Sequence, residues 1–400
     1  MSITITRLGH QGDGIAEGPV FVPRALPGEI VDGTIQGDTL VKPKIVTPSE
    51  HRVKAPCPVY NTCGGCSVQH ASDSFVAEWK TGIVRAALEA RGLDAPIRTL
   101  HTSPTRSRRR AKFSGKRTKT GAIVGFHGRG ATQIADADRC LVVTPSMAAL
   151  VDPLRELTVR LGSRKAEVGF QVTELENGFD LAIDGAKTPT PQETMDLMIW
   201  ARDNRVIRLS VNGELIGQEA VPTLGPLLPP PGAFLQATAH GEAALMACVS
   251  ETLGNAKTVV DLFAGCGTFS LPAARKADVH VVEGDRDLTA AAETAWRQGQ
   301  GLHHMTFETR DLFRRPLIAD ELNRFDAAII DPPRAGAEAQ TAEILISTLP
   351  KIAAVSCNPV TFARDAEALI HAGYRLNWVD VVDQFRWSHH VEIAASFSRD

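Results

Sequence analysis

The chain has 400 residues, a formal net charge of −3 and a hydrophobic content of 43%. This length is enough for two or three domains, and the hydrophobic content is enough for packed cores. No apolar run is long enough to span a bilayer and residues 1–7 contain no apolar signal core, so we expect a cytoplasmic protein that does not associate with membranes. Seven cysteines without an export signal predict metal binding or catalysis rather than disulfides.

The first fifty residues are predicted to form short strands separated by glycine-containing turns, with Pro27-Gly28 at one tight turn. Strands this short and closely spaced predict a small β-barrel of the oligonucleotide-binding type over residues 1–50. Such a barrel binds RNA in some proteins and is a spacer in others. The expected strands are residues 3–8, 20–22, 29–35 and 40–46.

Three cysteines follow the predicted barrel in a compact group, Cys57, Cys63 and Cys66, and Cys140 can complete a set of four ligands. Four thiolates bind either zinc or an iron–sulfur cluster. Structural zinc sites more often use two closely spaced pairs, so the spacing favours an iron–sulfur cluster over zinc, and zinc over four unrelated thiols. Cys248 and Cys266 have no partner at a ligand-like spacing and are predicted to be packing residues.

Residues 51–235 are expected to form a central domain that is rich in strands. Within it, residues 74–91 have the apolar spacing of a helix, and this helix is expected to pack on the C-terminal domain. Two more helices are expected at 147–161 and 193–202. Residues 98–119 carry nine lysines or arginines and no acid, which is typical both of a solvated surface and of a strand that binds phosphates.

Beyond a proline-rich linker or covering loop at 222–232, predicted strands alternate with predicted helices. This alternation predicts an α/β, Rossmann-like domain over residues 236–400, with a doubly wound, mainly parallel sheet and an antiparallel final pair. The expected strands are 258–261, 279–283, 306–308, 326–330, 352–356, 375–382 and 391–397. The expected helices are 240–253, 269–276, 287–298, 338–347 and 361–371.

Residues 258–270 combine a strand, a glycine-rich turn and the start of a helix, as in loops that bind a cofactor at the carboxyl edge of a sheet. Ser270 stands where a dinucleotide fingerprint has its third glycine, which disfavours a nicotinamide cofactor. Glu283 ends the next strand, where a carboxylate can accept two ribose hydroxyls. Asp311 follows the third strand and is placed to meet an adenine amino group.

The next two predicted strands end in residues that suggest chemistry on a pyrimidine. Asp331-Pro332-Pro333-Arg334 resembles the tetrad of amino-methyltransferases, but Arg334 replaces their final aromatic residue and argues against amino-group chemistry. Cys357 ends an apolar strand and Glu392 follows in a later one. A thiolate can add to carbon 6 of a pyrimidine, and a carboxylate can later remove the carbon 5 proton. A lone cysteine is more often a small buried hydrophobe, but the neighbouring motifs favour catalysis here.

Five segments resemble the RNA (uracil-5-)-methyltransferase family, which uses S-adenosyl-L-methionine. The resemblance implies a nucleophile at Cys357 and a proton acceptor at Glu392. Residues 386–389 depart from the family, which usually has a Pro-His-Thr-like stretch there. The segments are 234–236, 261–267, 331–336, 356–365 and 390–392. The implied cofactor contacts are Gln236, Phe263, Thr268, Glu283, Asp311 and Asp331.

Residues 8–29 resemble a TRAM domain, an RNA-binding appendage of several RNA-modifying enzymes. Ribosomal RNA members of the family resemble the cysteine pattern and carry a 4Fe-4S cluster, which tRNA members generally lack. The resemblance therefore implies a 4Fe-4S cluster on Cys57, Cys63, Cys66 and Cys140, 23S rRNA as the substrate, and no protein partner. The alternatives are a tRNA uridine or RNA cytosine-5 methyltransferase, or a non-catalytic RNA-binding assembly factor, against which the presence of both Cys357 and Glu392 argues.

Overall fold

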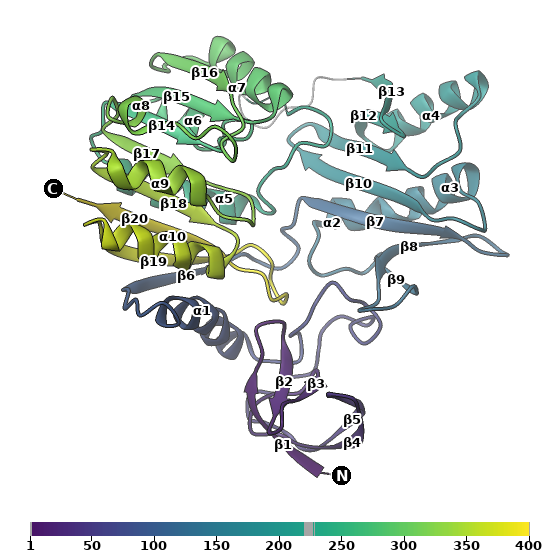
Figure 1. Cartoon of the computed structure of the whole chain (residues 1–400). Helices are drawn as coiled ribbons and strands as arrows, with labels where there is room; N and C mark the ends of the chain where they lie inside the picture. Colours follow the sequence, from purple (N-terminus) through teal and green to yellow (C-terminus); the bar gives the residue numbers. More distant parts are fainter. Residues whose placement is uncertain (1, 220–226, 228, 400) are drawn as a thin grey trace.

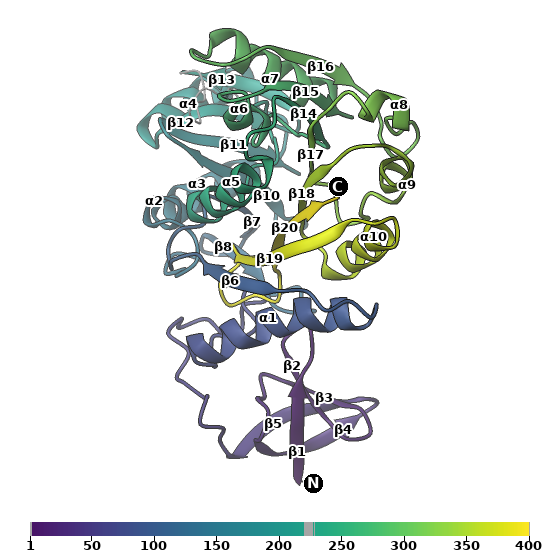
Figure 2. The same cartoon turned by 90° about the vertical axis from the view of Figure 1, so that its left-hand side faces the viewer.

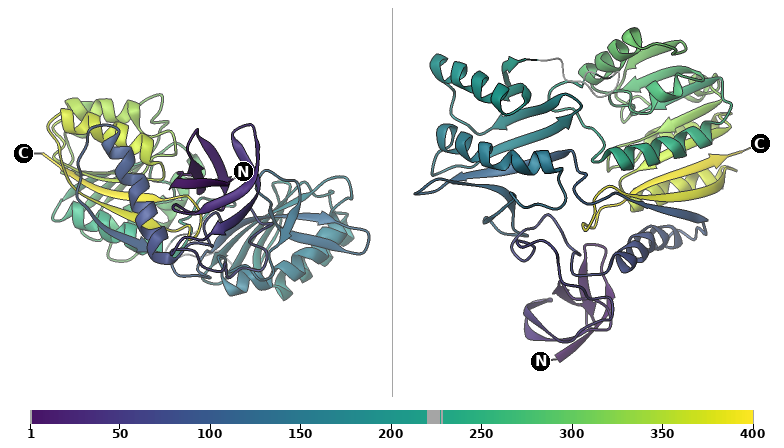
Figure 3. Two further views of the ribbon diagram at one scale, coloured as in Figure 1. Left: turned by 90° about the horizontal axis from the view of Figure 1, so that it is seen from below. Right: turned by 180° about the vertical axis from the view of Figure 1, so that it is seen from behind.

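The computed structural model describes residues 2–219, 227 and 229–399, which form a barrel and two larger units (Figure 1). The barrel lies at one end, and the two units that contain the larger sheets lie side by side beyond it; the views from below and behind show the same arrangement (Figure 3). The expected linker at 222–232 falls largely outside the described residues. Within the described part of the chain, no helix has the length and apolar character needed to cross a bilayer.

The N-terminal unit is a closed barrel of five strands in the order β1-β2-β3-β5-β4. Its core is small and is formed by buried aliphatic residues such as Ile5, Val22 and Leu40. The closed barrel agrees with the barrel expected over residues 1–50. Its strands are β1 (Ser2–Leu8), β2 (Asp13–Ala16), β3 (Val20–Pro23), β4 (Ile30–Gln36) and β5 (Thr39–Thr47).

The central unit is a seven-stranded sheet in the order β13-β12-β11-β10-β7-β8-β9. The single helix expected at 147–161 is in fact two, α2 (Pro145–Ala149) and α3 (Val151–Leu161). Pro153 explains the break, because it has no N–H to donate to the carbonyl of Ala149. The remaining elements are β7 (Arg110–Arg117), β8 (Ala122–His127), β9 (Ile134–Asp136), β10 (Val168–Leu175), β11 (Gly178–Asp184), α4 (Pro191–Asp203), β12 (Val206–Val211) and β13 (Glu214–Gln218).

The C-terminal unit contains an eight-stranded sheet in the order β16-β15-β14-β17-β18-β20-β19-β6. All neighbours are parallel except β20, which is antiparallel to both β18 and β19. Helices α5, α6 and α7 cover one hydrophobic cluster on this sheet, and α1, α8, α9 and α10 cover the other. The doubly wound sheet with its antiparallel final pair is therefore confirmed.

Apart from α8, which the sequence did not predict, the elements that follow residue 238 lie close to their expected positions. Helix α6 ends at Ala273 rather than at residue 276, because the chain continues in tighter turns: the N–H groups of Arg275 and Lys276 donate to carbonyls three residues earlier. The strands are β14 (Thr258–Leu262), β15 (Asp278–Glu283), β16 (Met305–Thr309), β17 (Ala327–Ile330), β18 (Lys351–Ser356), β19 (Arg375–Asp383) and β20 (Glu392–Ser398). The helices are α5 (Ala239–Leu253), α6 (Ser270–Ala273), α7 (Arg286–Gln298), α8 (Ala319–Leu322), α9 (Glu338–Ile346) and α10 (Pro359–His371).

Two elements from before the central sheet belong to the C-terminal unit. Strand β6 (Ile97–Thr102) pairs in parallel with β19, with Leu100 opposite Val381. Helix α1 (Asp73–Glu89) packs against α10, as expected, and lies next to β6 on the side of the barrel (Figure 2). Residues 97–102, which the sequence placed in the central domain, therefore form the edge strand of the C-terminal sheet.

Candidate active site

One edge of the eight-stranded sheet brings together the residues that follow its strands. Leu262 at the end of β14 pairs with Val282 on one side and with Ile330 on the other. Strand β20 runs in the opposite direction, and its Ile393 pairs with Ser356 at the end of β18. The ends of β14, β15, β17 and β18 and the start of β20 therefore share this edge, where ligands bind in open α/β sheets.

The glycine-rich turn after β14 is braced by the carboxylate of Glu283 at the end of β15. Glu283 accepts hydrogen bonds from the N–H groups of Gly265 at 2.8 Å and of Asp285 at 2.9 Å. Gly265 and Gly267 have φ angles of 57° and 90°, in the left-handed region that favours glycine. Because each carboxylate oxygen can accept a second hydrogen bond, Glu283 can brace the turn and still bind a ligand.

Phe263, the first residue after β14, also has a positive φ of 61°. Its ring lies 5.3 Å from the ring of Phe313, measured between centroids. The N–H of Phe313 donates to the Asp311 carboxylate at 3.0 Å. Phe313 was not selected from the sequence, although an exposed aromatic residue two positions after an expected site acid was an available signal.

Thr268 and Gln236 lie on the side of the site that faces the central unit. Thr268 precedes α6 and lines a cleft of about 910 Å³ to which both larger units contribute, including Glu174 and Glu242. Gln236 is buried, and its side-chain oxygen accepts a hydrogen bond from the Gln384 amide at 2.6 Å. The six expected cofactor contacts therefore extend from the exposed Asp311 to the buried Gln236.

Cys357, Glu392 and Asp331 form a group of mutually interacting acids where β17, β18 and β20 meet. Burial, and then the charges of Glu392 and Asp331, raise the pKa of the half-buried Cys357 thiol to about 11, whereas Arg334 lowers it. Burial and the charge of Asp331 raise the pKa of Glu392 to about 8, and burial raises the pKa of Asp331 to about 7. Glu392 and Asp331 therefore make ionisation of the thiol more costly, and Asp331 does the same to Glu392.

Arg334 connects this group to the segment that precedes β20. Its guanidinium lies 2.8 Å from Nδ1 of His390, and its carbonyl accepts a hydrogen bond from the Asn358 side chain at 2.9 Å. Burial and neighbouring cations lower the pKa of His390 to about 4, so its imidazole is neutral near pH 7 and can accept from Arg334. Arg334 thus provides a fixed positive charge beside Cys357.

A second buried aspartate, Asp261, lies beneath the site within β14. Its carboxyl group accepts a hydrogen bond from the Ser270 hydroxyl. Burial, together with the charges of Asp331 and Glu283, raises the pKa of Asp261 to about 7. The sheet edge therefore concentrates carboxyl groups in apolar surroundings, and the resulting pKa shifts are typical of functional sites.

The four cysteines expected to bind a cluster line one cavity of about 280 Å³ between the 57–66 segment and the central sheet. Burial raises the pKa of Cys57 and Cys63, and raises that of Cys66 to about 12; the negative charge of Cys140 adds to each shift. Sulfurs of the set also accept backbone hydrogen bonds, at 3.3 Å for Cys63 and 3.4 Å for Cys140. The structure therefore brings the expected set together.

The spacing of these sulfurs bears on which group they can hold. Among the described residues, no three of these sulfurs lie within 4.8 Å of one another. Four thiolates on one zinc ion lie about 4 Å apart, because each Zn–S bond is about 2.3 Å long. The sulfurs as they stand are therefore farther apart than ligands of one zinc ion would be.

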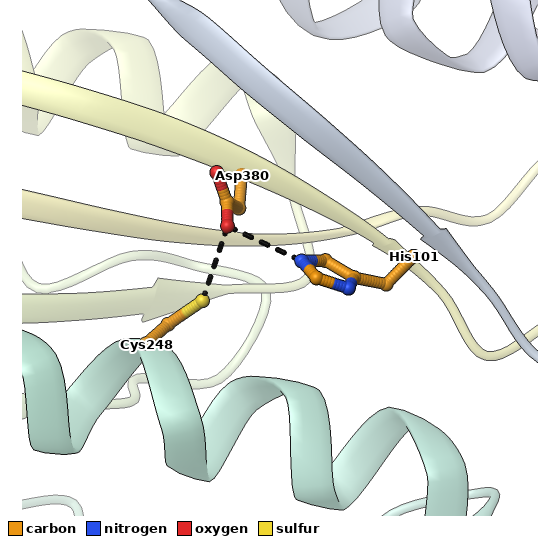
Figure 4. A group of neighbouring side chains, drawn as sticks. All are labelled: His101, Cys248 and Asp380. Carbon is orange, nitrogen blue, oxygen red and sulfur yellow. Dashed lines mark hydrogen bonds and ion pairs between the residues drawn. The ribbon is translucent and has the colours of Figure 1, made fainter.

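Another potential metal-binding group lies elsewhere, at the junction of β6, β19 and α5 (Figure 4). Asp380 Oδ2 is 3.2 Å from His101 Nε2 and 3.4 Å from Cys248 Sγ. Arg98, however, donates to both oxygens of Asp380, at 3.0 and 3.2 Å, and lies 3.7 Å from the centre of the Trp378 ring. Because the carboxylate already has a cationic partner, this group is best explained as packing between elements, as expected for Cys248.

The basic stretch at 98–119 is partly used inside the protein. Arg98 binds Asp380, and the buried Arg109 pairs with Glu242 of α5. The stretch therefore provides fewer charges for phosphates than its sequence suggests. Its exposed members are Arg106, Lys112, Lys116, Arg117 and Lys119.

Comparison with known proteins decides the family. The sequence model described as tRNA (uracil-5-)-methyltransferase matches residues 230–399. The 23S rRNA (uracil(1939)-C(5))-methyltransferase of Shewanella sp. (strain MR-4) is 32% identical over 99% of this chain and 95% of its own length. The chain belongs to the RNA (uracil-5-)-methyltransferase family. An uncharacterised RNA methyltransferase of Rhizobium meliloti (strain 1021) is 41% identical over 100% of this chain and 99% of that relative.

The fold of nearly the whole chain matches that of a solved methyltransferase structure. The Pyrococcus abyssi tRNA (uracil-54, C5)-methyltransferase, crystallised with S-adenosyl-L-homocysteine, superposes with a TM-score of 0.77 at 23% identity, covering 99% of both chains. Membership of the family confirms the expectation of an enzyme that uses S-adenosyl-L-methionine to methylate uracil in RNA.

Proposed function

We propose that this methyltransferase modifies carbon 5 of a uridine in 23S rRNA through a covalent adduct with Cys357. The observation that carries the mechanism is the shared location of Cys357 and Glu392, where the charge of Glu392 acts directly on the thiol. The ribosomal substrate is supported by the Shewanella relative, which is named for uracil 1939 of 23S rRNA, and by the four cysteines that line one cavity.

In the first step, Cys357 attacks carbon 6 of the uracil. A sulfur–carbon bond forms while the electron pair of the carbon 5–carbon 6 double bond moves toward oxygen 4, which makes carbon 5 nucleophilic. Arg334 assists because its positive charge favours the thiolate. S-adenosyl-L-methionine, when bound, supplies the methyl group that carbon 5 takes.

In the second step, Glu392 accepts the proton from carbon 5. The electron pair of that carbon–hydrogen bond restores the double bond, and the carbon–sulfur pair leaves with Cys357 as a thiolate. A carboxylate with a pKa of about 8 is a stronger base than an exposed glutamate, which suits it to this task near neutral pH. Asp331 or a water molecule is the next candidate for the base.

We propose that the cofactor binds along the same sheet edge. Glu283 would accept the ribose hydroxyls, Asp311 would meet the adenine amino group, and Phe263 would pack on the adenine beside Phe313. These roles are supported by the shared edge and by the free acceptor positions of Glu283. The full set of proposed contacts is Gln236, Phe263, Thr268, Glu283, Asp311 and Asp331.

We further propose that Cys57, Cys63, Cys66 and Cys140 hold a 4Fe-4S cluster. The proposal is supported by the common cavity, the backbone donors to sulfur and the wide sulfur spacing. Burial raises the pKa of Cys57, Cys63 and Cys66, so their thiolates need a cationic partner, and iron supplies it. The cluster would hold the 57–66 segment to the central sheet, and no step of the reaction requires its electrons.

The barrel is proposed to act as a TRAM-like RNA-binding domain together with the exposed cations of residues 106–119. A barrel of this type can bind oligonucleotides, and exposed lysines and arginines attract phosphates. Binding through these cations would weaken as the salt concentration rises.

The mechanism can be tested by trapping. RNA that carries 5-fluorouridine at the target has no carbon 5 proton to remove, so we expect the wild-type enzyme with S-adenosyl-L-methionine to form a denaturation-resistant adduct. Cys357→Ala should form none. An adduct that maps to another residue would contradict the proposed nucleophile.

The substrate can be tested by mass spectrometry of nucleosides from separated 23S rRNA and tRNA of cells that lack the protein. Loss of 5-methyluridine only from tRNA would overturn the ribosomal assignment.

A further inference from the structure

Helix α1 contains a fully buried lysine whose partners are about three hundred residues away in the sequence. Lys80 has 0% exposure. Its ammonium group donates to the Asp383 carboxylate at 2.5 Å, to the Phe385 carbonyl at 3.1 Å and to the His390 carbonyl at 3.1 Å. An ammonium group has three hydrogens, so its full donor capacity is used. All three acceptors lie within residues 383–391, which run from the last residue of β19 to the residue before β20 and are called here the 383–391 loop.

These contacts join the two ends of the 383–391 loop. Asp383 and Phe385 lie at its start and His390 lies near its end, so Lys80 closes the loop through one buried charge. Glu392, the proposed base, is two residues beyond His390 and begins β20. A change in the closure of the loop would therefore shift the backbone that carries Glu392.

The side chain of His390 connects the same loop to the nucleophile. Its Nδ1 lies 2.8 Å from the Arg334 guanidinium, and Arg334 is the cation that lowers the pKa of Cys357. Lys80 holds the carbonyl of His390 while Arg334 contacts its ring. The loop therefore links Lys80 to both proposed reacting groups, although Lys80 contacts neither of them.

Stability alone would not require this arrangement. A buried ion pair is often no more stabilising than apolar residues of similar volume. The pair with Asp383 uses one hydrogen of the ammonium group, whereas the other two bind backbone carbonyls of the loop. Those two contacts fix backbone positions, which a simple charge pair does not do.

We propose that Lys80 is a positioning residue. It closes the 383–391 loop and thereby holds Glu392 and His390 in fixed positions relative to Cys357. The inference rests on the proposed role of Glu392 as the base. It predicts that loss of Lys80 impairs the step that follows methyl transfer more than cofactor binding. Five of the six proposed cofactor contacts follow other strands of the sheet, and only Gln236 contacts the loop, through the Gln384 amide.

The test uses a double variant, because Lys80→Met alone leaves a buried carboxylate without its cation. Lys80→Met with Asp383→Asn removes both charges. A matched control is Arg208→Met with Asp180→Asn, which removes the buried ion pair between β11 and β12 of the central sheet. Glu392→Gln is the positive control for a blocked final step.

We expect the Lys80 double variant to retain its affinity for S-adenosyl-L-methionine and to turn over about 10- to 100-fold more slowly, since displacements of about 1 Å can have effects of this size. A methylated protein–RNA adduct should accumulate, as in Glu392→Gln, and backbone amides in residues 383–391 should exchange hydrogen faster. The Arg208 double variant should show neither change. General destabilisation would instead lower adduct and product together.

Two results would overturn the inference while leaving the proposed function intact: normal turnover of the Lys80 double variant, or slow turnover without an adduct while Glu392→Gln accumulates one. If Glu392→Gln retains activity and forms no adduct, the base assignment fails separately. In that case slow turnover with faster exchange in residues 383–391 would still support positioning of the loop by Lys80, and unchanged exchange would overturn it.

Discussion

The protein contains two sulfur sites whose surroundings differ. At the edge of the eight-stranded sheet, Cys357 faces two carboxyl groups and one arginine. Between the 57–66 segment and the central sheet, four thiols face one another and backbone N–H groups. Burial raises thiol pKa values at both sites, and at Cys357 the charges of Glu392 and Asp331 add to the shift. The comparison separates a thiol suited to attack a substrate from thiols suited to bind a metal cluster.

The two sites also differ in how the backbone holds them. Cys357 lies between β18 and α10, where the Asn358 side chain caps the helix by accepting from the Val360 N–H at 3.1 Å. The 57–66 segment has no helix or strand and is tied to the central sheet by the Gly64 N–H, which donates to the His127 carbonyl at 2.9 Å. Cys357 is therefore positioned by a strand and a helix, whereas the 57–66 segment is held by individual contacts such as this hydrogen bond.

The largest expected effect comes from removing the nucleophile. Cys357→Ala should lower methylation by about 10⁴-fold or more, as for other enzymes that lose a nucleophile, while leaving S-adenosyl-L-methionine binding nearly unchanged. The rate of methyl transfer to RNA and calorimetric titration with the cofactor would check this. The matched control is Cys248→Ala, which removes a buried thiol from the same unit and should retain activity. Normal turnover by Cys357→Ala would contradict the covalent mechanism.

Removing the proposed base should stall the reaction later. Glu392→Gln cannot accept the carbon 5 proton, so we expect turnover to fall by about 10² to 10⁴-fold and a methylated protein–RNA adduct to accumulate. Denaturing gel electrophoresis with labelled RNA would detect it. Full activity without an adduct would assign the base to another group.

Disrupting the other sulfur site should affect RNA binding more than chemistry. Cys63→Ser should reduce the cluster content of protein purified without oxygen, in which the wild type should contain about four iron and four sulfide per chain. We expect RNA affinity to fall by about 10-fold with little change in cofactor affinity, because the 57–66 segment lies outside the sheet edge. Elemental analysis and RNA binding would measure this; stoichiometric zinc without iron in the wild type would refute the cluster.

The pH dependence of the rate should reflect the acids at the sheet edge. Glu392 must be deprotonated to accept a proton and Cys357 must be deprotonated to attack, and their pKa values are raised to about 8 and about 11. Both groups lose protons as the pH rises, so we expect kcat/KM to increase between about pH 6.5 and 9. The increase should be up to about 100-fold per unit below pH 8, where both groups must lose a proton, and about 10-fold per unit above it. A rate that is flat or falls over this range would contradict the assignment.

A smaller effect is expected on folding. The carboxyl groups of Asp261, Asp331 and Glu392 have pKa values raised to about 7, 7 and 8, so the folded state retains protons that the unfolded chain releases at lower pH. Their contribution to stability is full below about pH 4 and is lost as the pH rises toward 8. Thermal unfolding should show Glu392→Gln gaining stability relative to wild type between pH 5.5 and 8.5; a constant difference in Tm would contradict this.

Local patterns predicted much of the fold, because strand and helix periodicity and turn residues act over short distances. The antiparallel final pair and the closed barrel follow from such patterns. The break between α2 and α3 was missed, although Pro153 alone explains it. The pairing of β6 with β19 was also missed, because residues so far apart in the sequence leave no periodic signal.

Some residues of the candidate site could also be predicted from local sequence patterns, and others could not. Cys357, Glu392 and Asp331 could be proposed from the sequence because each lies at the end or the start of an expected strand, and the structure brings them to one edge. Lys80 was not found, since a lysine in an amphipathic helix is ordinarily a solvent-exposed residue. Its role depends on tertiary contacts with the 383–391 loop, which the sequence of helix α1 does not encode by itself.

The place of β6 at the sheet edge has a consequence for protein synthesis. The ribosome makes β6 before any other strand of its sheet, and its partner β19 is made only after β14 to β18. Until then the nascent chain exposes a strand edge that could pair with another chain. A fragment that ends before residue 375 would lack β19 and would keep this edge of β6 unpaired. The catalytic unit therefore becomes complete only when β6 pairs with β19, which is made much later.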